Sequence, residues 1–556
     1  MFDHFRQKLR AVGRTRPTPI AAGGYFWFLE PAGHALFGAN GPKLDGESVV
    51  VKSNLQRTIS RVALPGGTVY VKTCRANTPR SWAREVLRPA KAKLEFDNAL
   101  SLARLGIATV EPLAWGSRSR TWPGESVLIT RERAGAQPFE DYFGRTITTR
   151  SNRERFSVFR EFGAFLAKLH EAGVTHPDPH PGNFLIEFDS ANRPQFVLMD
   201  LHAIRFGEPL DWPQSRDNLT VLNRWFQLRA SSADRLRFWK AYRSRRKSLS
   251  DDASPREIER ATAESNNRFW TARLDRYRGN NRDSHKVRGP AARGFSLREL
   301  PPKLVSSWFA DPDRPFQLPN TRILKDSPSS TVAEFPLEDR TVIYKRFRIN
   351  TWPKLLKNAL RRSQAMRSWL FGNNVRDRGL PTARPLAAFE HTRFGIPRAG
   401  YVAFEKIPDA KELDRAVAEL TRWTEGERRL ILENWCARIG RLLRTMHERQ
   451  VSHRDLKAAN ILMSGTDPLA AMPVLIDLVG VEVGRAVPEA IRVRDLARLN
   501  VSFLATPIVR HRHRRQLLQT YLGPADRGEW KRWWKAIAAA TREKVERNAR
   551  IGRPIA

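Results

Sequence analysis

The chain has only two cysteines, Cys74 and Cys436, among its 556 residues. Two thiols cannot build a disulfide framework or a cysteine-based zinc site, and their scarcity suits a reducing cytoplasm. No run approaches the roughly 18 consecutive apolar residues that a membrane-spanning helix needs. Residues 1–16 carry scattered charges and no continuous apolar stretch, so we expect no secretory signal there.

Acidic residues are scarce relative to basic ones. The chain has 58 Asp and Glu against 97 Lys and Arg, a formal net charge of +39. Such a field favours anionic partners: phosphorylated lipids, membrane surfaces, nucleotides or nucleic acid. No recognisable nucleic-acid module accompanies the charge, which disfavours nucleic acid. A genome that prefers arginine codons is the alternative source of the excess. Hydrophobic residues make up 41% of the chain, enough for proper cores.

An internal repeat predicts the architecture. Residues 49–75 align without a gap on 322–348, which places three pairs of identical residues 273 positions apart: Lys52 with Lys325, Thr58 with Thr331 and Lys72 with Lys345. Residues 169–186 align on 446–463 with an offset of 277. Two nearly equal offsets over segments of this length indicate that the fold is duplicated.

Each copy is predicted to begin with strands and to end with helices. In the first copy we expect a small β-rich part followed by a mostly helical part. The expected elements are strands 49–51, 58–62 and 68–72, a helix near 84–105, a strand 126–130, a helix 156–169 and a strand 195–199. The expected domain limits are a basic N-terminal extension 1–44, a first domain 45–280, a Gly- and Arg-rich linker 281–315 and a second domain 316–556.

The sharpest motif is HRDLKAANIL, residues 453–462. The order His-Arg-Asp, followed by Asn five residues after the Asp, is that of the protein-kinase catalytic loop. One tight loop then brings a base to the acceptor hydroxyl and an amide to a metal on the ATP phosphates. In this interpretation Asp455 is the base, Asn460 binds Mg²⁺, Lys457 approaches the γ-phosphate and His453 braces the loop.

Two further residues complete the pattern in the second copy. Asp477 ends an apolar strand 17 residues after Asn460, at the position of a second Mg²⁺ ligand, and Lys345 lies on a strand like the lysine that pairs with the α- and β-phosphates. The first copy has the same four types at matching positions: Lys72, Asp178, Asn183 and Asp200. Its loop differs, because Pro177 replaces the arginine and His180 the lysine. A zinc site at His176 and His180 is disfavoured, since no third ligand lies nearby.

The rest of the predicted nucleotide site is less regular. Neither copy has a Gly-rich phosphate loop, and we expect turn hydroxyls to take its place in the second copy, with these residues near the phosphates: Ser329, Ser330 and Thr331. Glu132 and Glu405 end matching strands at a polar hinge and are predicted to contact the cofactor. Glu95 fits the helix glutamate that pairs with the strand lysine, but its counterpart is Ser368.

The segments LGIATVEPLA (105–114) and RGLPTARPLA (378–387), taken with the two loops, resemble the lipopolysaccharide kinase family of the protein-kinase-like superfamily. The resemblance implies an α+β fold of two tandem protein-kinase-like bilobal domains, each with a β-rich N-lobe and a helical C-lobe. It implies ATP and Mg²⁺ as cofactors and phosphorylation of a sugar hydroxyl of a phosphorylated glycolipid at the cytoplasmic face of the inner membrane. The family has a single kinase domain as a rule, so the duplication departs from it.

Three alternatives stay open at this point: a serine/threonine protein kinase, a kinase–pseudokinase regulatory pair and a non-catalytic ATP-binding scaffold. The segments after Asp200 and Asp477 are short for a peptide platform, which favours a sugar or small-molecule acceptor. Basic and aromatic residues close both copies, at 224–247, 510–521 and 530–537. Either they dock on an anionic membrane surface, or the aromatics are core and the arginines line solvated helix faces.

Overall fold

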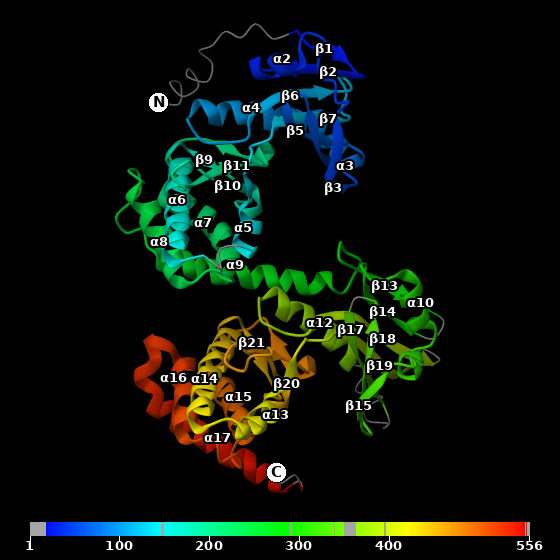
Figure 1. Ribbon diagram of the computed structural model, residues 1–556, viewed down its shortest axis with the longest axis vertical. Helices are drawn as coiled ribbons and strands as arrows, with labels where there is room; N and C mark the ends of the chain where they lie inside the picture. The colour runs from blue at the N-terminus through cyan, green and yellow to red at the C-terminus, as the bar shows by residue number, and fades with distance from the viewer. Residues whose placement is uncertain are drawn as a thin grey trace. The chain divides into compact units, whose positions relative to one another are not determined.

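The computed structural model describes residues 18–145, 150–289, 292–338, 340–349, 363–393, 396–550 and 552. The chain divides into two compact units, Met1–Ser265 and Asn266–Ala556. Figure 1 shows the elements of each unit by label. The limit between the units falls inside one helix, α9 (Pro255–Arg276).

The first unit begins with a seven-stranded antiparallel sheet. Alternation of β-branched and polar residues makes its central strands, and β5 buries Val69 and Val71 while Lys72 points to the other face. The strands run across the sheet in this order: β1 (Ile20–Ala22), β2 (Tyr25–Leu29), β6 (Pro112–Ser117), β7 (Ser126–Arg131), β5 (Gly67–Cys74), β4 (Arg57–Leu64) and β3 (Glu47–Asn54). Helices α2 (Pro31–Phe37), α3 (Pro79–Leu87) and α4 (Lys91–Arg104) accompany it.

Helices dominate the rest of the first unit. Phe139, Phe162, Phe196 and Phe226 interlock at its centre with ring centroids 4.8–5.9 Å apart. The helices are α5 (Phe139–Arg145), α6 (Asn152–Glu171), α7 (Trp212–Phe226), α8 (Ser232–Ser244) and the first part of α9. Two small sheets lie beside them: β11 (Pro194–Leu198), β10 (Phe184–Phe188) and β8 (Gln137–Pro138); and β12 (Arg205–Phe206) with β9 (Val174–Thr175).

The second unit repeats this strand order one for one. Its large sheet consists of β13 (Ser284–Arg288), β14 (Ala292–Leu297), β18 (Pro385–Arg393), β19 (Ile396–Glu405), β17 (Arg340–Arg348), β16 (Ser330–Leu337) and β15 (Arg322–Asp326). Helices α10 (Pro302–Ala310) and α12 (Gln364–Asp377) accompany it. The smaller sheets also match: β20 (Ala410–Glu412), β22 (Ile461–Ser464) and β23 (Met472–Leu475); and β21 (Val451–His453) with β24 (Val481–Val483).

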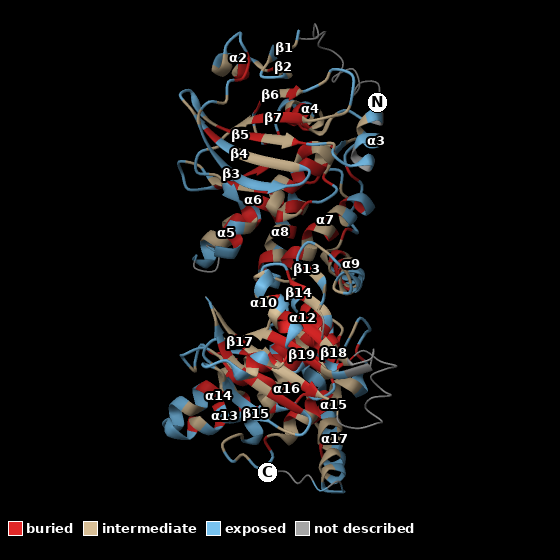
Figure 2. Ribbon diagram, turned by 90° about the vertical axis from the view of Figure 1, so that its right-hand side faces the viewer, coloured by how far each residue is buried: buried red, intermediate tan, exposed pale blue. Residues whose placement is uncertain are grey.

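The helices of the second unit are α13 (Leu413–Glu419), α14 (Glu425–Glu448), α15 (Glu489–Val501), α16 (His511–Asp526) and α17 (Trp530–Arg550). Buried residues, red in Figure 2, follow the large sheet and the inner helix faces of each unit. Among the described residues, no helix combines the length and apolar character needed to cross a bilayer.

The structure differs from the sequence-based expectation in three segments. The proposed linker 281–315 contains β13, β14 and α10, and both strands join the second sheet. The proposed N-terminal extension contains β1, β2 and α2. The helix expected near 84–105 is two helices, since Pro89 interrupts the run between α3 and α4. Short strands rich in Gly and Arg conceal the period-2 pattern, and their pairing appears only in three dimensions.

Candidate functional site

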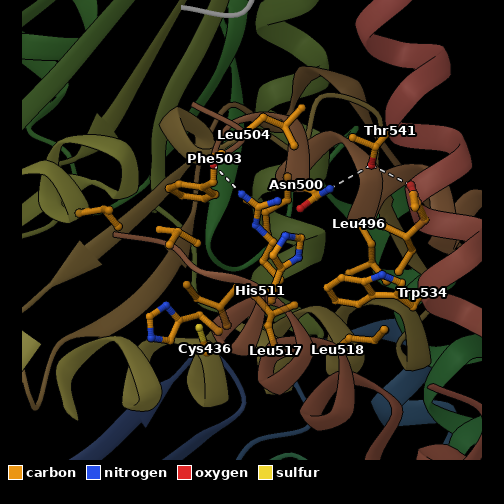
Figure 3. Close-up of a pocket in the computed structure, with 18 of the residues that line it drawn as sticks. Cys436, Leu496, Asn500, Phe503, Leu504, His511, Leu517, Leu518, Trp534 and Thr541 are labelled. Carbon is orange, nitrogen blue, oxygen red and sulfur yellow. Dashed lines mark hydrogen bonds between the residues drawn. The ribbon is translucent and has the colours of Figure 1, made fainter. Parts of the chain in front are cut away.

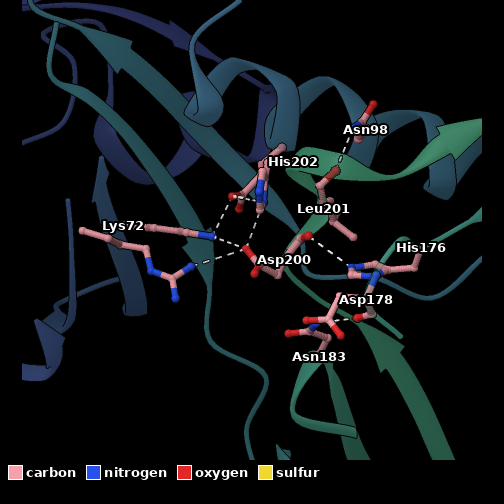
Figure 4. A network of polar contacts seen from close by, with 10 residues as sticks. Lys72, Asn98, His176, Asp178, Asn183, Asp200, Leu201 and His202 are labelled. Carbon is pink, nitrogen blue, oxygen red and sulfur yellow. Dashed lines mark hydrogen bonds and ion pairs between the residues drawn. The ribbon is translucent and has the colours of Figure 1, made fainter. Parts of the chain in front are cut away.

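A compact polar network lies in the first unit where the large sheet meets the helical part. Lys72 Nζ on β5 contacts Glu95 Oε1 at 2.6 Å and Asp200 Oδ1 at 2.8 Å. Glu95 is a buried residue of α4, and Asp200 lies two residues after the end of β11. Figure 4 shows Lys72 and Asp200 facing each other, with His202 above them. Three segments far apart in the sequence therefore meet at the Lys72 ammonium group.

Two more basic side chains contact the Asp200 carboxylate. Arg57 Nη1 lies 3.5 Å and His202 Nδ1 3.2 Å from Asp200 Oδ1. His202 also lies 3.7 Å from Glu95 Oε1, and Glu95, Asp200 and His202 form a group whose ligand atoms all lie within 4.8 Å of one another. Sequence reasoning missed both Arg57 and His202, because neither stands at a motif position that the second copy repeats: the equivalent residues there are Ser330 and Val479.

The contacts in this network keep Asp200 and Lys72 ionised. Burial alone would raise the pKa of Asp200, but His202 and Lys72 overcome it and hold that pKa well below its usual range. Burial would likewise lower the pKa of Lys72, yet the carboxylates of Glu95 and Asp200 raise it. The ion pair is therefore charged throughout the physiological pH range.

The loop that precedes β10 in the first unit is fixed by its own side chains. His176 is buried; its Nδ1 accepts a hydrogen bond from the Asp178 N–H at 3.1 Å, and its Nε2–H donates to the Asp200 carbonyl at 3.3 Å. Burial lowers the pKa of His176, consistent with this neutral tautomer. Asn183 Nδ2 donates to the Asp178 carbonyl at 2.8 Å, which leaves its Oδ1 available (Figure 4). His180 Nδ1 accepts from the Gly182 N–H at 3.1 Å and so caps its own turn.

The second unit has a simpler version of the same site. Lys345 Nζ on β17 contacts Asp477 Oδ1 at 3.1 Å. Asp477, like Asp200, has a left-handed backbone conformation, with φ 56° and ψ 57° against φ 56° and ψ 52°. At the position of Glu95, Ser368 is buried, and its hydroxyl donates to the Gln364 carbonyl within α12. Asp477 is thus the acid that Lys345 contacts among the described residues.

The catalytic-loop candidates of the second unit lie together. Asn460 Nδ2 donates to the Asp455 carbonyl at 2.7 Å and to its Oδ2 at 3.2 Å. Lys457 Nζ lies 3.4 Å from Asp455 Oδ2, and both side chains are exposed. His453 accepts from the Asp455 N–H at 3.3 Å and contacts the Ile476 carbonyl at 3.2 Å.

A polar residue of the following helix is hydrogen-bonded to each loop. In the second unit Asp495 Oδ2 accepts from the His453 N–H at 2.9 Å. Its counterpart in the first unit, Asn218, donates to the His176 carbonyl at 2.7 Å and contacts His170 Nε2 at 3.0 Å. Sequence reasoning missed this pair, although Asn218 and Asp495 stand 277 residues apart, as the catalytic loops do.

The other predicted cofactor residues do not reach the Lys–Asp pairs in this structure. At the start of β16, Thr331 is buried; its hydroxyl donates to Asp326 Oδ1 at 2.9 Å and accepts from Arg346 at 3.1 Å. Ser330 N–H donates to the Ser327 hydroxyl, and the Ser329 carbonyl accepts from the Arg348 N–H.

The two hinge glutamates pair with neighbouring arginines. Glu132 forms two contacts with Arg61, at 2.7 and 2.8 Å. Glu405 lies 3.8 Å from Arg384, the residue just before β18, which pairs with β19. Neither carboxylate is aimed at the lysine of its copy by any contact among the described residues.

Each helical part also encloses an apolar cavity at an equivalent place. The cavity of the second unit, about 530 Å³, lies among α14, α15, α16 and α17, and Figure 3 shows Leu496, Phe503 and Leu518 around it. A cavity of about 500 Å³ in the first unit is lined by the matching residues Leu219 and Phe226. A matching amide–hydroxyl hydrogen bond of 3.1 Å occurs at each: Asn500 and Thr541 line the cavity of the second unit, and Asn223, which donates to Thr262, lines that of the first. The duplication thus extends to the interior of the helical parts.

In both units a strand lysine of the antiparallel sheet contacts an aspartate, beside a His-x-Asp loop that ends in Asn. This is the arrangement of the protein-kinase-like class. The profile of the lipopolysaccharide kinase (Kdo/WaaP) family matches residues 51–242 and 307–521, and the chain belongs to this family. The family match falls on both units.

Individual relatives match shorter stretches. The chain is 31% identical over 127 residues to a 3-deoxy-D-manno-octulosonic acid kinase of Haemophilus influenzae, covering 22% of this chain and 49% of that protein. It is 29% identical over 102 residues to the enzyme of the same name from Vibrio cholerae, covering 18% and 39%. The matches thus span half or less of these relatives' length. A solved structure of WaaP in complex with acyl carrier protein shares 21% identity over 39% of this chain and 88% of that chain, with a TM-score of 0.31.

Proposed function

We propose that the chain transfers the γ-phosphate of ATP to a sugar hydroxyl of lipopolysaccharide inner core or a related glycolipid, at the cytoplasmic face of the membrane. The pairing of a strand lysine with a left-handed aspartate in both units, Lys72 with Asp200 and Lys345 with Asp477, carries the proposal. Each unit then acts as one bilobal kinase-like domain, with its large sheet as N-lobe and its helices as C-lobe. Membership of the lipopolysaccharide kinase family supports the acceptor class.

The residues of the second unit fit a hard divalent cation such as Mg²⁺. Asn460 uses its Nδ2 on Asp455, so its Oδ1 stays available, and Asp477 keeps 37% of its side chain exposed. Oxygen donors of this kind suit Mg²⁺. Asn460 and Asp477 would hold the cation in this unit, and Asn183 and Asp200 in the first. When bound, the ion neutralises charge on the ATP phosphates.

The remaining roles follow from the kinase-like motif position of each side chain. Lys345 and Lys72 would orient the α- and β-phosphates from the sheet. Asp455 and Asp178 would accept the proton of the acceptor hydroxyl, and Lys457 would approach the γ-phosphate. A hydroxyl held within hydrogen-bond reach of such a base gains roughly 10²–10⁴-fold in rate.

The segment between the metal-binding aspartate and the next helix supports a small acceptor over a peptide. It covers residues 478–488 before α15 in the second unit and 201–211 before α7 in the first. Each contains a single 3-10 turn and a short strand, which leaves little backbone for a peptide platform.

Asp200 and Asp477 are the carboxylates of the two proposed metal sites. The double variant Asp200→Asn/Asp477→Asn should abolish cation-dependent transfer from γ-labelled ATP to core glycolipid, because each change removes a carboxylate from the proposed metal site. Asp252→Asn/Asp526→Asn, two exposed residues outside both sites, serves as the matched control. Undiminished transfer by the first double variant would refute the assignment. Label on a generic protein acceptor instead of the glycolipid would identify a protein kinase.

A further inference from the structure

A second polar hollow lies in the first unit, between α6, α8 and the β10–β11 hairpin. Its volume is about 1020 Å³, and it shares no lining residue with the Lys72–Asp200 network. Small side chains of both helices form its floor, among them Ser157, Ala164 and Ala241. The helices approach closely at Gly163, where an added Cβ would lie 2.3 Å from the Phe238 carbonyl. Close packing at that point leaves the hollow beside it, a groove that we call the α6–α8 groove.

The α6–α8 groove is strongly cationic. Seven arginine or lysine side chains line it against two glutamates, Glu154 and Glu161. Three of the seven pair with a neighbouring acid: Arg150, Arg160 and Arg193. The other four have no ion pair among the residues that the structure describes: Arg153, Arg237, Lys240 and Arg245. Concentrating unpaired cations in a concave surface raises the local potential and attracts an anion.

The second unit provides an internal comparison. Gly440 there makes the contact of Gly163, with an added Cβ 2.7 Å from the Leu517 carbonyl, so α14 and α16 pack as α6 and α8 do. Their sequences align with offsets of 277 and 279 residues, the latter fixed by Phe238 and Leu517.

At four groove positions the second unit lacks the cation: Leu430 replaces Arg153, Ala437 replaces Arg160, Gln516 replaces Arg237 and Gln519 replaces Lys240. Elsewhere on the same face its charges offset one another, because Arg438 and Arg441 stand at the positions of Glu161 and Ala164, and Glu433 stands at that of Phe156. The helix pair therefore forms without these cations. A general preference for arginine codons would add charge to both copies alike. The cationic groove is a property of the first unit and serves something other than folding.

Size and wall composition narrow the class of ligand. A volume of this order accommodates a ligand larger than one phosphate ion, since small-molecule sites measure about 300–1,000 Å³. Tyr142, Phe156 and Phe188 form an apolar wall, and Phe188 is 39% exposed. The guanidinium of Arg237 lies 3.2 Å from the Phe156 ring centroid and so covers one face of that ring, where a nucleobase would otherwise stack. Phosphates on a saccharide with attached apolar chains match this combination better than nucleic acid does.

We propose that the α6–α8 groove binds the multiply phosphorylated saccharide headgroup of a membrane lipid. The groove is connected to the catalytic loop through β10, because Phe188 follows Asn183 by five residues of extended chain, about 17 Å. A short oligosaccharide covers such a span, so the same lipid can present a sugar to Asp178 while its phosphates occupy the groove. That the bound lipid is also the acceptor rests on the proposed function; the groove's binding of the headgroup does not.

The test is equilibrium binding of the full chain, without ATP, to vesicles that contain rough lipopolysaccharide with its phosphates intact. The charge variant is Arg153→Gln/Lys240→Gln, two exposed residues whose loss leaves the core untouched. Each lost charged contact should weaken binding by roughly tenfold. The control Arg104→Gln/Arg260→Gln removes the same charge from exposed positions outside the groove and should leave the affinity unchanged.

A second variant, Ser244→Trp, fills the groove without changing its charge and should weaken binding as well. Two further vesicles identify the ligand: the same lipid after phosphatase treatment, and phosphatidylglycerol at equal surface charge. The proposal expects weak, groove-independent binding to both. Three results would each overturn the proposal. The charge variant could lose binding to phosphatidylglycerol as much as to the lipopolysaccharide, or both groove variants could bind the lipopolysaccharide unchanged. The groove could also bind a single-stranded oligonucleotide in preference to the lipid.

Failure of this proposal can be told from failure of the proposed function. Groove-dependent binding with no phosphate transfer would leave the groove standing and remove the acceptor assignment. Transfer that is abolished by Asp200→Asn/Asp477→Asn but unaffected by Arg153→Gln/Lys240→Gln at limiting glycolipid would keep the kinase and remove the groove.

Discussion

At the scale of single residues, the two units treat the same aspartate differently. Asp200 is surrounded by Lys72, Arg57 and His202, whereas Lys345 is the one basic side chain that contacts Asp477 among the described residues. The acid is therefore more fully neutralised in the first unit. Close cations favour the ionised carboxylate but compete with a metal for its oxygen atoms.

Buried histidines make the stability of the first unit depend on pH. Burial lowers the pKa of His170 to about 3, and its Nε2–H and Nδ1 are held by Asn218 and Tyr242. In the unfolded state His170 binds a proton near pH 6.5, whereas in the folded state it stays neutral down to about pH 3. The contribution of His170 to the unfolding free energy is therefore complete above about pH 6.5 and is lost as the pH falls toward 3. The unfolding free energy should fall by about 1.4 kcal/mol per pH unit in that window for this one group.

The measurement is urea unfolding at a series of pH values from 7 to 4. His170→Gln should flatten the slope, because glutamine does not titrate, and the exposed His34→Gln should leave it unchanged. Parallel slopes in the wild type and His170→Gln would contradict the prediction.

At the scale of elements, the close crossing of α6 and α8 depends on a glycine. An alanine at Gly163 would place its Cβ 2.3 Å from the Phe238 carbonyl and 3.2 Å from Ala241. The backbone cannot yield as a flexible side chain does, so the helices must separate. Alanine gains up to about 1 kcal/mol over glycine in helix propensity, but overpacking costs about 1–3 kcal/mol and should prevail.

Gly163→Ala should therefore lower the thermal midpoint of the first unit. Gly144→Ala in α5 is the matched control, since nothing lies within 4 Å of the added Cβ and alanine favours a helix. If both substitutions raise the midpoint, the crossing is less tight than the structure indicates.

At the scale of the whole molecule, duplication allows the copies to specialise. The second has Asp455, Lys457 and Asn460 within one contact network. In the first, His180 caps its own turn, and no contact joins it to the exposed Asp178 carboxylate among the described residues. The first in turn has the buried Glu95 that positions Lys72, for which the second has Ser368.

We predict that the second unit performs most of the phosphate transfer. Asp455→Ala should slow single-turnover transfer by roughly 10²–10⁴-fold, because it removes a positioned base, and Asp178→Ala should slow it less. The matched comparison is the two variants at equal nucleotide saturation. A larger loss in Asp178→Ala would reverse the ranking and make the second unit the regulatory one.

The sequence alone determined the duplication, the strand-then-helix order of each copy and the pairing of Lys72 with Glu95, because these follow from repeats and motif spacing. The family suggested by the motifs is confirmed by the match over both copies. Only the tertiary structure decided that β13 and β14 belong to the second sheet, since a strand's partners depend on pairing distant in the chain. It alone brought Arg57 and His202 to Asp200, and the cations of α6 and α8 to one groove. Charges spread along a chain give no sign of the surface on which folding will gather them.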